Sequence, residues 1–193
     1  NEKGFGFIEY KEGEAYYGID MEIAALLAKE LGKELVINNM DFDAVCLSVG
    51  QHKCDIAMAG LTINDERKQM IDFSKPYASI HQVVVAQKGA DITSEDDVKG
   101  KKISVQTGTS GADYATTLTS DVIYQKGYSE VVLDVLYGKA FCEVVDDAVA
   151  YAQVAAHPDE LEVFNVLNAP REHCGFVFNK DDAALRNLVN SAL

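Results

Sequence analysis

Residues 16–37 read YYGIDMEIAALLAKELGKELVI. Apolar residues recur in this stretch at helical spacing, which predicts an amphipathic helix between an N-terminal cap at Asp20 and a stop at Gly32. Residues 34–38 (ELVIN) follow directly and are typical of a strand. A helix that leads into a strand through a very short loop is a repeating unit of α/β proteins.

The same alternation continues to the end of the chain. Because strands alternate with helices, we expect an α/β architecture with mainly parallel sheets. Residues 86–97 are polar and interrupt the pattern, which then starts afresh, so this segment is the best candidate for a linker between two lobes. The predicted strands are 54–59, 82–86, 102–106, 143–145, 161–166 and 175–178, and the predicted helices are 41–49, 107–118 after a glycine-rich turn, 130–137, 146–156 and 181–193.

The composition excludes several classes of partner. The chain of 193 residues has 17 Lys and Arg against 31 Asp and Glu, which gives a formal net charge of −14. A surface this acidic repels phosphate groups, so we expect neither nucleic acid nor anionic membrane as a partner. No apolar run is long enough to span a membrane. No secretory leader or lipid-anchor segment opens the sequence, so we expect a mature or trimmed form.

Cysteine and histidine spacing indicates no metal site. Cys46, Cys54, Cys142 and Cys174 form no Cys-x-x-Cys pair, and the four histidines do not stand at zinc spacing. We therefore expect small buried residues or free thiols, with no metal and no cofactor. Three disulfide pairings are open to four cysteines, and the sequence does not choose among them.

The first candidate site segment is GLTINDER, residues 60–67, just after an apolar strand. Open α/β sheets bind ligands at this position. Gly60 allows close approach of the backbone, Thr62 offers a hydroxyl and an N–H, and Arg67 carries a fork of donors suited to a carboxylate. The alternative is a solvated surface arginine paired with Asp65 or Glu66.

The second candidate segment is QTGTSG, residues 106–111, where a strand passes through a glycine-rich turn into a helix. The free N–H groups of a first helical turn bind anions, and a carboxylate is the expected anion. The phosphate-loop pattern is absent. An ordinary strand–helix turn explains the segment equally well.

Two further features complete the candidate site. Asp146 and Asp147 follow an apolar strand and open a helix, where one acid is explained as a helix cap and the other is free to bind an ammonium group. Paired acids can also indicate general acid–base chemistry. Phe5 and Phe42 each lie near a predicted strand end, where they either pack in the core or bracket a ligand side chain.

Taken in order, these segments resemble the polar-amino-acid type of bacterial extracellular solute-binding proteins, the receptors of ABC importers. The resemblance runs from residue 1 to residue 193 and is most specific over residues 60–77. It implies a two-lobed periplasmic-binding-protein-like type II fold, in which two crossing hinge strands join lobes of residues 1–85 plus 175–193 and residues 86–174. The segments that carry it are YYGIDMEIAALLAKELG, DFDAV, KCDIAMAGLTINDERK, IDFSKPY, GKKISVQTGTSGADYA and VVDDAVAYA.

The resemblance also implies a role for each candidate residue. One free L-amino acid would bind in the cleft, with its α-carboxylate on Arg67 and its α-ammonium on Asp146. Asp146 is preferred to Asp147 because it lies five residues after Phe141, where the family usually carries an aspartate. The remaining contacts would be the Thr62 and Ser110 N–H groups and the Thr109 hydroxyl for the carboxylate, the Gly60 carbonyl and Thr62 hydroxyl for the ammonium, Phe5 and Phe42 around the side chain, and Glu2, Gln106 and Tyr10 at its far end.

Glu2 and Gln106 favour a polar neutral or cationic amino acid such as glutamine, arginine or lysine. The resemblance implies a monomeric periplasmic or lipid-anchored extracellular receptor with no catalytic residues, which delivers its ligand to the membrane subunits of an ABC importer. Two alternatives stay open. One is a dehydratase on the same scaffold with Glu143, Asp146 or Asp147 as the general acid, and the other is the sensor domain of a membrane receptor.

Overall fold

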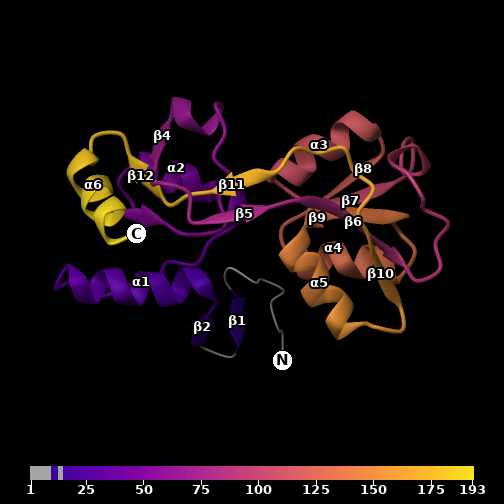
Figure 1. The fold of residues 1–193 in the computed structure, drawn as a ribbon, viewed down its shortest axis with the longest axis horizontal. Helices are drawn as coiled ribbons and strands as arrows, with labels where there is room; N and C mark the ends of the chain where they lie inside the picture. Colours follow the sequence, from indigo (N-terminus) through magenta and orange to yellow (C-terminus); the bar gives the residue numbers. More distant parts are fainter. Residues whose placement is uncertain (1–9, 13–14) are drawn as a thin grey trace. The chain divides into compact units, whose positions relative to one another are not determined.

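The structure is a computed structural model that describes residues 10–12 and 15–193 (Figure 1). These residues form two compact units. The first contains the described residues up to Ser79 together with Glu172–Leu193, and the second contains Ile80–Arg171. Both units combine helices with sheets, which confirms the predicted α/β class, but the three-stranded sheet of the first unit is antiparallel and the sheet of the second is mixed, and not mainly parallel as predicted. None of the helices in the described part of the chain has both the length and the apolar character that a membrane crossing needs.

The second unit contains a five-stranded mixed sheet in the order β10-β6-β9-β7-β8. β6 pairs antiparallel with both β10 and β9, whereas β7 pairs parallel with both β9 and β8. The mixed pairing follows from the chain path, because β7, β8, β9 and β10 are joined in turn through helices and run in the same direction, whereas β6 lies between β9 and β10 and runs antiparallel to both. The elements are β6 (Gln82–Gln87), β7 (Ile103–Gln106), α3 (Ser110–Leu118), β8 (Val122–Gln125), α4 (Tyr128–Leu136), β9 (Cys142–Asp146), α5 (Asp147–Ala156) and β10 (Leu161–Phe164).

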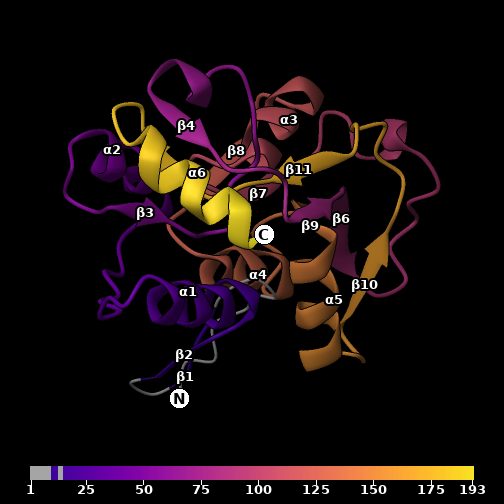
Figure 2. The ribbon, with the colours of Figure 1, turned by 60° about the vertical axis from the view of Figure 1, so that its left-hand side comes forward.

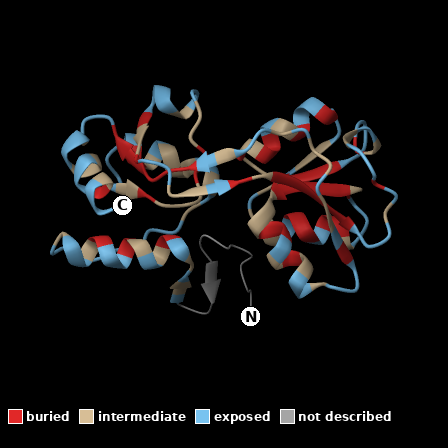
Figure 3. Cartoon of the chain, viewed as in Figure 1, coloured by how far each residue is buried: buried red, intermediate tan, exposed pale blue. Residues whose placement is uncertain are grey.

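Helices cover both faces of this sheet, with α3 on one side and α4 and α5 on the other (Figures 1 and 2). Alternate residues of β6 therefore enter different cores: Val84 packs with the residues of α3, and Val83 and Val85 pack with those of α4 and α5. The continuous β-branched run of β6 is explained by this double burial. Figure 3 shows the buried strands of the sheet in red.

The first unit contains a three-stranded sheet in the order β3-β12-β4, with β12 antiparallel to both neighbours. Val177 of β12 packs on the α2 side, whereas Phe176 and Phe178 pack against residues of α1 and α6. A separate two-stranded sheet pairs β5 with β11. The elements are β1 (Tyr10–Glu12), β2 (Ala15–Tyr17), α1 (Ile19–Glu30), η1 (Phe42–Ala44), α2 (Val45–Gly50), β3 (Ile56–Ala57), η2 (Arg67–Gln69), β4 (Ile71–Phe73), β5 (Ala78–Ile80), β11 (Glu172–Cys174), β12 (Val177–Asn179) and α6 (Ala183–Ala192).

Two local predictions in the first unit are wrong. Residues 34–38 form no strand, because no neighbouring strand in the described part of the chain supplies the ladder of backbone hydrogen bonds that a strand needs. Their apolar side chains instead line a hollow of about 770 Å³ beside α1. Asp20 does not cap α1 either: Gly18 holds the cap position, and Asp20 lies inside the first turn, fully buried.

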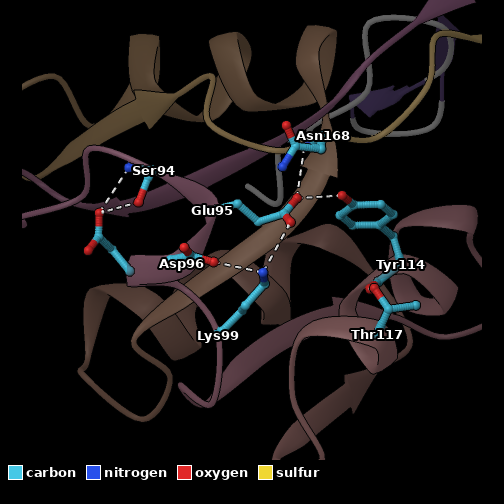
Figure 4. A network of polar contacts seen from close by, with 8 residues as sticks. Ser94, Glu95, Asp96, Lys99, Tyr114, Thr117 and Asn168 are labelled. Atoms are coloured by element: carbon cyan, nitrogen blue, oxygen red, sulfur yellow. Dashed lines mark hydrogen bonds and ion pairs between the residues drawn. The ribbon is translucent and has the colours of Figure 1, made fainter.

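The segment predicted as a linker is folded into the second unit (Figure 4). The Glu95 carboxylate accepts hydrogen bonds from the Tyr114 hydroxyl of α3 and from the Asn168 N–H, at 2.8 Å, after β10. These bonds are the main reason that the pKa of Glu95 is lowered. Asp97 and Ser94 form a capping box around η3 (Glu95–Asp97). The polar composition of residues 86–97 therefore belongs to a turn that is hydrogen-bonded to the rest of the unit, and not to a linker.

The division between the units also differs from the predicted one. The prediction drew the boundaries after residues 85 and 174, whereas the compact units divide after Ser79 and Arg171. The difference has a physical basis, because the whole of β6 hydrogen-bonds within the sheet of the second unit, and β11 pairs with β5.

A buried acid lies between the α4 and α5 helices and the sheet of the second unit. Glu143 on β9 has no exposed surface, and burial raises its pKa from 4.5 to about 8, although the Gln153 amide at 3.3 Å opposes the shift. Nearby, Asp134 accepts hydrogen bonds from Ser104 at 2.9 Å and from Gln125 at 2.7 Å. Glu143 is therefore protonated in the native protein at neutral pH.

We expect Glu143→Gln to flatten the dependence of stability on pH. Native Glu143 keeps its proton up to about pH 8, whereas the unfolded chain loses it near 4.5, so the wild-type free energy of unfolding falls as the pH rises through this window. Urea unfolding of both proteins at about pH 5 and about pH 9 measures the effect, which should amount to a few kcal/mol. Parallel pH dependences of the two proteins would contradict the expectation.

Candidate functional site

The loop after β3 is held by two side chains from distant parts of the first unit. Gly60 has φ of +57°, a left-handed conformation that favours glycine. Its N–H donates to Asp20 Oδ2 at 3.2 Å, and its carbonyl accepts from the Cys174 thiol at 3.3 Å. Asp20 and Cys174 are both fully buried. Both polar groups of the Gly60 backbone are therefore fixed in direction.

Thr62 continues this loop and lies opposite Cys174 in an isolated antiparallel bridge. Its hydroxyl donates to Glu172 Oε2 at 2.7 Å. The adjacent Ile63 N–H donates to the His173 carbonyl at 2.8 Å. Because the Thr62 hydroxyl donates to Glu172, its oxygen can act toward any other polar group only as an acceptor.

Arg67 lies in η2, and its backbone N–H donates to Asn64 Oδ1 at 2.8 Å. Its guanidinium donates to the Thr62 carbonyl at 2.8 Å and lies over the Phe42 ring, 5.7 Å from the centroid. The carbonyl and the ring both constrain the direction of the guanidinium, which is a planar fork of donors of the kind that suits a carboxylate. Three predicted residues, Phe42, Thr62 and Arg67, are thus brought together in the first unit.

The second unit brings together another group of predicted residues at the end of β7. Thr109 caps α3: its hydroxyl accepts from the Ala112 N–H at 3.0 Å and donates to the Gln106 carbonyl at 2.8 Å. The Gln106 side chain donates to the Lys126 carbonyl at 2.9 Å. Ser110 is the first residue of the helix. The Thr109 hydroxyl therefore has a local structural role that the sequence analysis did not assign to it.

The two neighbouring acids after β9 have different roles. Asp147 accepts from the Ala148 N–H at 2.9 Å within its own helix turn. Asp146 occupies the cap position of α5 but makes no side-chain cap bond, and its Oδ1 accepts from Gln82 Nε2 at 2.7 Å. The same Gln82 nitrogen lies 3.3 Å from Ser110 Oγ. Gln82 thus links two predicted ligand residues.

Several residues of this arrangement were missed by sequence reasoning, and some predictions cannot be placed. Glu2 and Phe5 lie outside the described residues, and Tyr10 lies in β1. Glu143, proposed above as an alternative general acid, is enclosed in the core. The described cysteines are free, and no cluster of His, Cys, Asp or Glu among the described residues could hold a metal ion. The missed residues, for which local pattern gave no signal, are Gln82, Glu172, Cys174 and Asp20 in its contact with Gly60.

Burial of Asp20 has an electrostatic consequence. Desolvation raises the pKa of its carboxyl from 3.8 to about 6, while Tyr77 and the Gly60 N–H lower it. The charged form is therefore disfavoured by burial and retained chiefly through these two donors. This is the balance expected of a carboxylate kept inside the protein to hold a backbone group.

Comparison with known proteins gives one consistent result. The family model of bacterial extracellular solute-binding proteins, family 3, matches residues 2–193. The arginine-binding extracellular protein ArtP of Bacillus subtilis (strain 168) is 30% identical over 191 residues, which cover 96% of this chain and 74% of ArtP.

Solved structures resemble the chain equally well. Holo ArgBP from T. maritima matches with a TM-score of 0.91 and 31% identity, covering 98% of this chain and 85% of that one. The arginine-, lysine-, histidine-binding protein ArtJ from Geobacillus stearothermophilus matches with a TM-score of 0.91 and 28% identity, covering 99% and 84%. The predicted two-lobed fold is confirmed by these matches.

We expect Asp20→Ala to lower the free energy of unfolding by about 1–3 kcal/mol, because the Gly60 N–H loses its acceptor. Asp20→Asn should have a smaller effect, since the amide carbonyl still accepts. Glu22→Ala is the matched control, because Glu22 is an exposed acid in the same helical turn. Urea unfolding measures all three variants, and equal stability of Asp20→Ala and Glu22→Ala would contradict the role assigned to Asp20.

Proposed function

Because the chain belongs to the bacterial extracellular solute-binding proteins, family 3, we propose that it is a periplasmic or extracellular receptor for one free polar amino acid. In this proposal the receptor is monomeric and delivers its ligand to the membrane subunits of an ABC importer. It binds and releases the amino acid unchanged, so it is not an enzyme.

One observation carries the proposal: each unit presents one oriented charge of opposite sign. Arg67 is a cation held by the Thr62 carbonyl and the Phe42 ring, and Asp146 is a carboxylate held by Gln82 and not by its own helix. A free amino acid is a zwitterion, and both its charges must be satisfied when it leaves water. The two residues offer the complement of that pair of charges.

In the proposed complex, the ligand carboxylate is bound by Arg67 and by the N–H groups of Thr62 and Ser110. The ammonium is bound by Asp146, the Gly60 carbonyl and the Thr62 hydroxyl oxygen. Bonds already present support these assignments. The Thr62 hydroxyl donates to Glu172, so its oxygen acts toward an ammonium as an acceptor, and the Gly60 carbonyl is fixed in direction by the bond from the Cys174 thiol.

The proposed ligand class is glutamine, arginine or lysine, with the side chain against Phe42 and its far end toward Gln106. The net charge of −14 raises the local concentration of a cationic ligand. Relatives named for arginine, lysine and histidine binding support a basic amino acid in particular. A ligand held by groups of both units stabilises the arrangement in which both contact it, and this is the form that an importer would recognise.

A thermal-shift screen with the twenty amino acids tests the proposed class. A ligand that binds only the native state raises the melting temperature, and at a given concentration a tighter ligand raises it more. We expect arginine, lysine or glutamine to give the largest rise, and acidic amino acids to give little. If none of the twenty raises the melting temperature, the proposed function is wrong.

We expect Arg67→Ala to weaken binding of the amino acid identified in that screen by at least about tenfold, since a charge-assisted hydrogen bond contributes about 1.5–3 kcal/mol. Isothermal titration calorimetry measures the affinity. Lys68→Ala is the matched control, because Lys68 is an adjacent exposed cation that pairs with Asp65 at 3.2 Å. Unchanged affinity in Arg67→Ala would refute the assignment.

A further inference from the structure

Gln82 is a buried amide at the start of β6, with only 3% of its surface exposed. It lies directly opposite Asp146 in the β6–β9 register, so the two side chains share one face of the sheet. Its amide nitrogen lies 2.7 Å from Asp146 Oδ1 and 3.3 Å from Ser110 Oγ. A carboxamide nitrogen has two hydrogens, and these two contacts use one each.

The Asp146 carboxylate needs such a partner because it lacks the usual one. An aspartate at the cap position of a helix normally accepts an N–H of the first helical turn. Asp146 makes no such bond to α5. Its orientation at the end of β9 is therefore set by contacts with other elements, of which the bond from Gln82 is short and buried.

The other end of the Gln82 amide argues against a purely stabilising role for this residue. Its Oε1 is buried and makes no hydrogen bond with the described residues. It is also confined by α3, because a Cβ added at Gly111 would lie 2.7 Å from that oxygen and 3.2 Å from the Val144 carbonyl. A buried acceptor without a partner is unfavourable, and an apolar side chain of similar shape would avoid this penalty.

We propose that Gln82 is a positioning residue that aims the Asp146 carboxylate and the Ser110 side chain, and so makes the α-ammonium group a requirement for ligand binding. This inference rests on the proposed function, in which Asp146 binds the ammonium. Gln82 does not contact the ligand in this scheme. Removing its amide leaves the carboxylate in place without its fixed direction, so selectivity for an ammonium group is lost while the fold is retained.

Gln82→Met tests the proposal, because methionine has similar length and no hydrogen-bonding amide. Calorimetry compares arginine with 5-guanidinopentanoic acid, which is the same molecule without the α-amino group. We expect the variant to bind arginine about tenfold more weakly than the wild type does, as for one lost bond to a charged group, and to bind the des-amino acid as the wild type does. Its melting temperature without ligand should be unchanged or higher.

Gln87→Met is the matched control, since Gln87 is the last residue of the same strand, is exposed, and donates to the Val135 carbonyl at 3.0 Å. Its affinity for arginine should equal that of the wild type. In an Asp146→Asn background, Gln82→Met should cause no further loss, because the two residues act through one contact. Two outcomes would overturn the proposal. One is that the losses of arginine affinity caused by the two substitutions are fully additive, and the other is that Gln82→Met weakens binding of both ligands equally and lowers the melting temperature.

One readout does not depend on any ligand. Loss of a donor to a carboxylate raises its pKa, so carbon-13 NMR titration should show a higher pKa for Asp146 in Gln82→Met than in the wild type and no change in Gln87→Met. An unchanged Asp146 pKa would overturn the positioning role. If this shift is present but the wild type binds no arginine, the fault lies with the proposed ligand and not with the contact between Gln82 and Asp146.

Discussion

The sheet of the second unit is covered by helices on both faces, and this constraint determines the role of each polar residue on its strands. Successive side chains of a strand point to opposite faces. On β9, Val145 enters the core beneath α4 and α5, and Val144 enters the core beneath α3. Two acids three positions apart on this strand, Glu143 and Asp146, consequently meet opposite surroundings.

Glu143 is the second residue of the strand, where it is fully buried, and its pKa is raised to about 8 by burial. Asp146 is the last residue of the strand, where it is half-buried and accepts from the Gln82 amide. The first carboxyl is therefore neutral and structural, whereas the second lies at the strand end and accepts a hydrogen bond from another strand. The surroundings of the two acids differ because of their positions on one strand and not because of their residue types.

The fold class, most helices and the long strands were predictable, because each depends on residues close in sequence. The run QVVVA at 82–86 forms β6, and the helical spacing after Ile19 forms α1. Short strands such as β4 and β11 were not predictable, because three residues carry no periodicity and their pairing is decided by distant neighbours. The strand predicted at residues 34–38 is wrong for the same reason, because strand propensity without a pairing partner does not make a strand.

The residues proposed for the site stand out in the sequence, whereas the contacts that support them do not. Arg67, Thr62 and Asp146 follow strand ends in recognisable segments. Their supporting contacts join residues that are far apart in sequence: Thr62 and Glu172 are 110 residues apart, and Gln82 and Asp146 are 64 apart. Local sequence pattern does not indicate such pairs. These supports decide what each group offers a ligand. A free hydroxyl can either donate or accept. Because the Thr62 hydroxyl donates to Glu172, its oxygen can only accept from a ligand, and it therefore suits an ammonium better than a carboxylate.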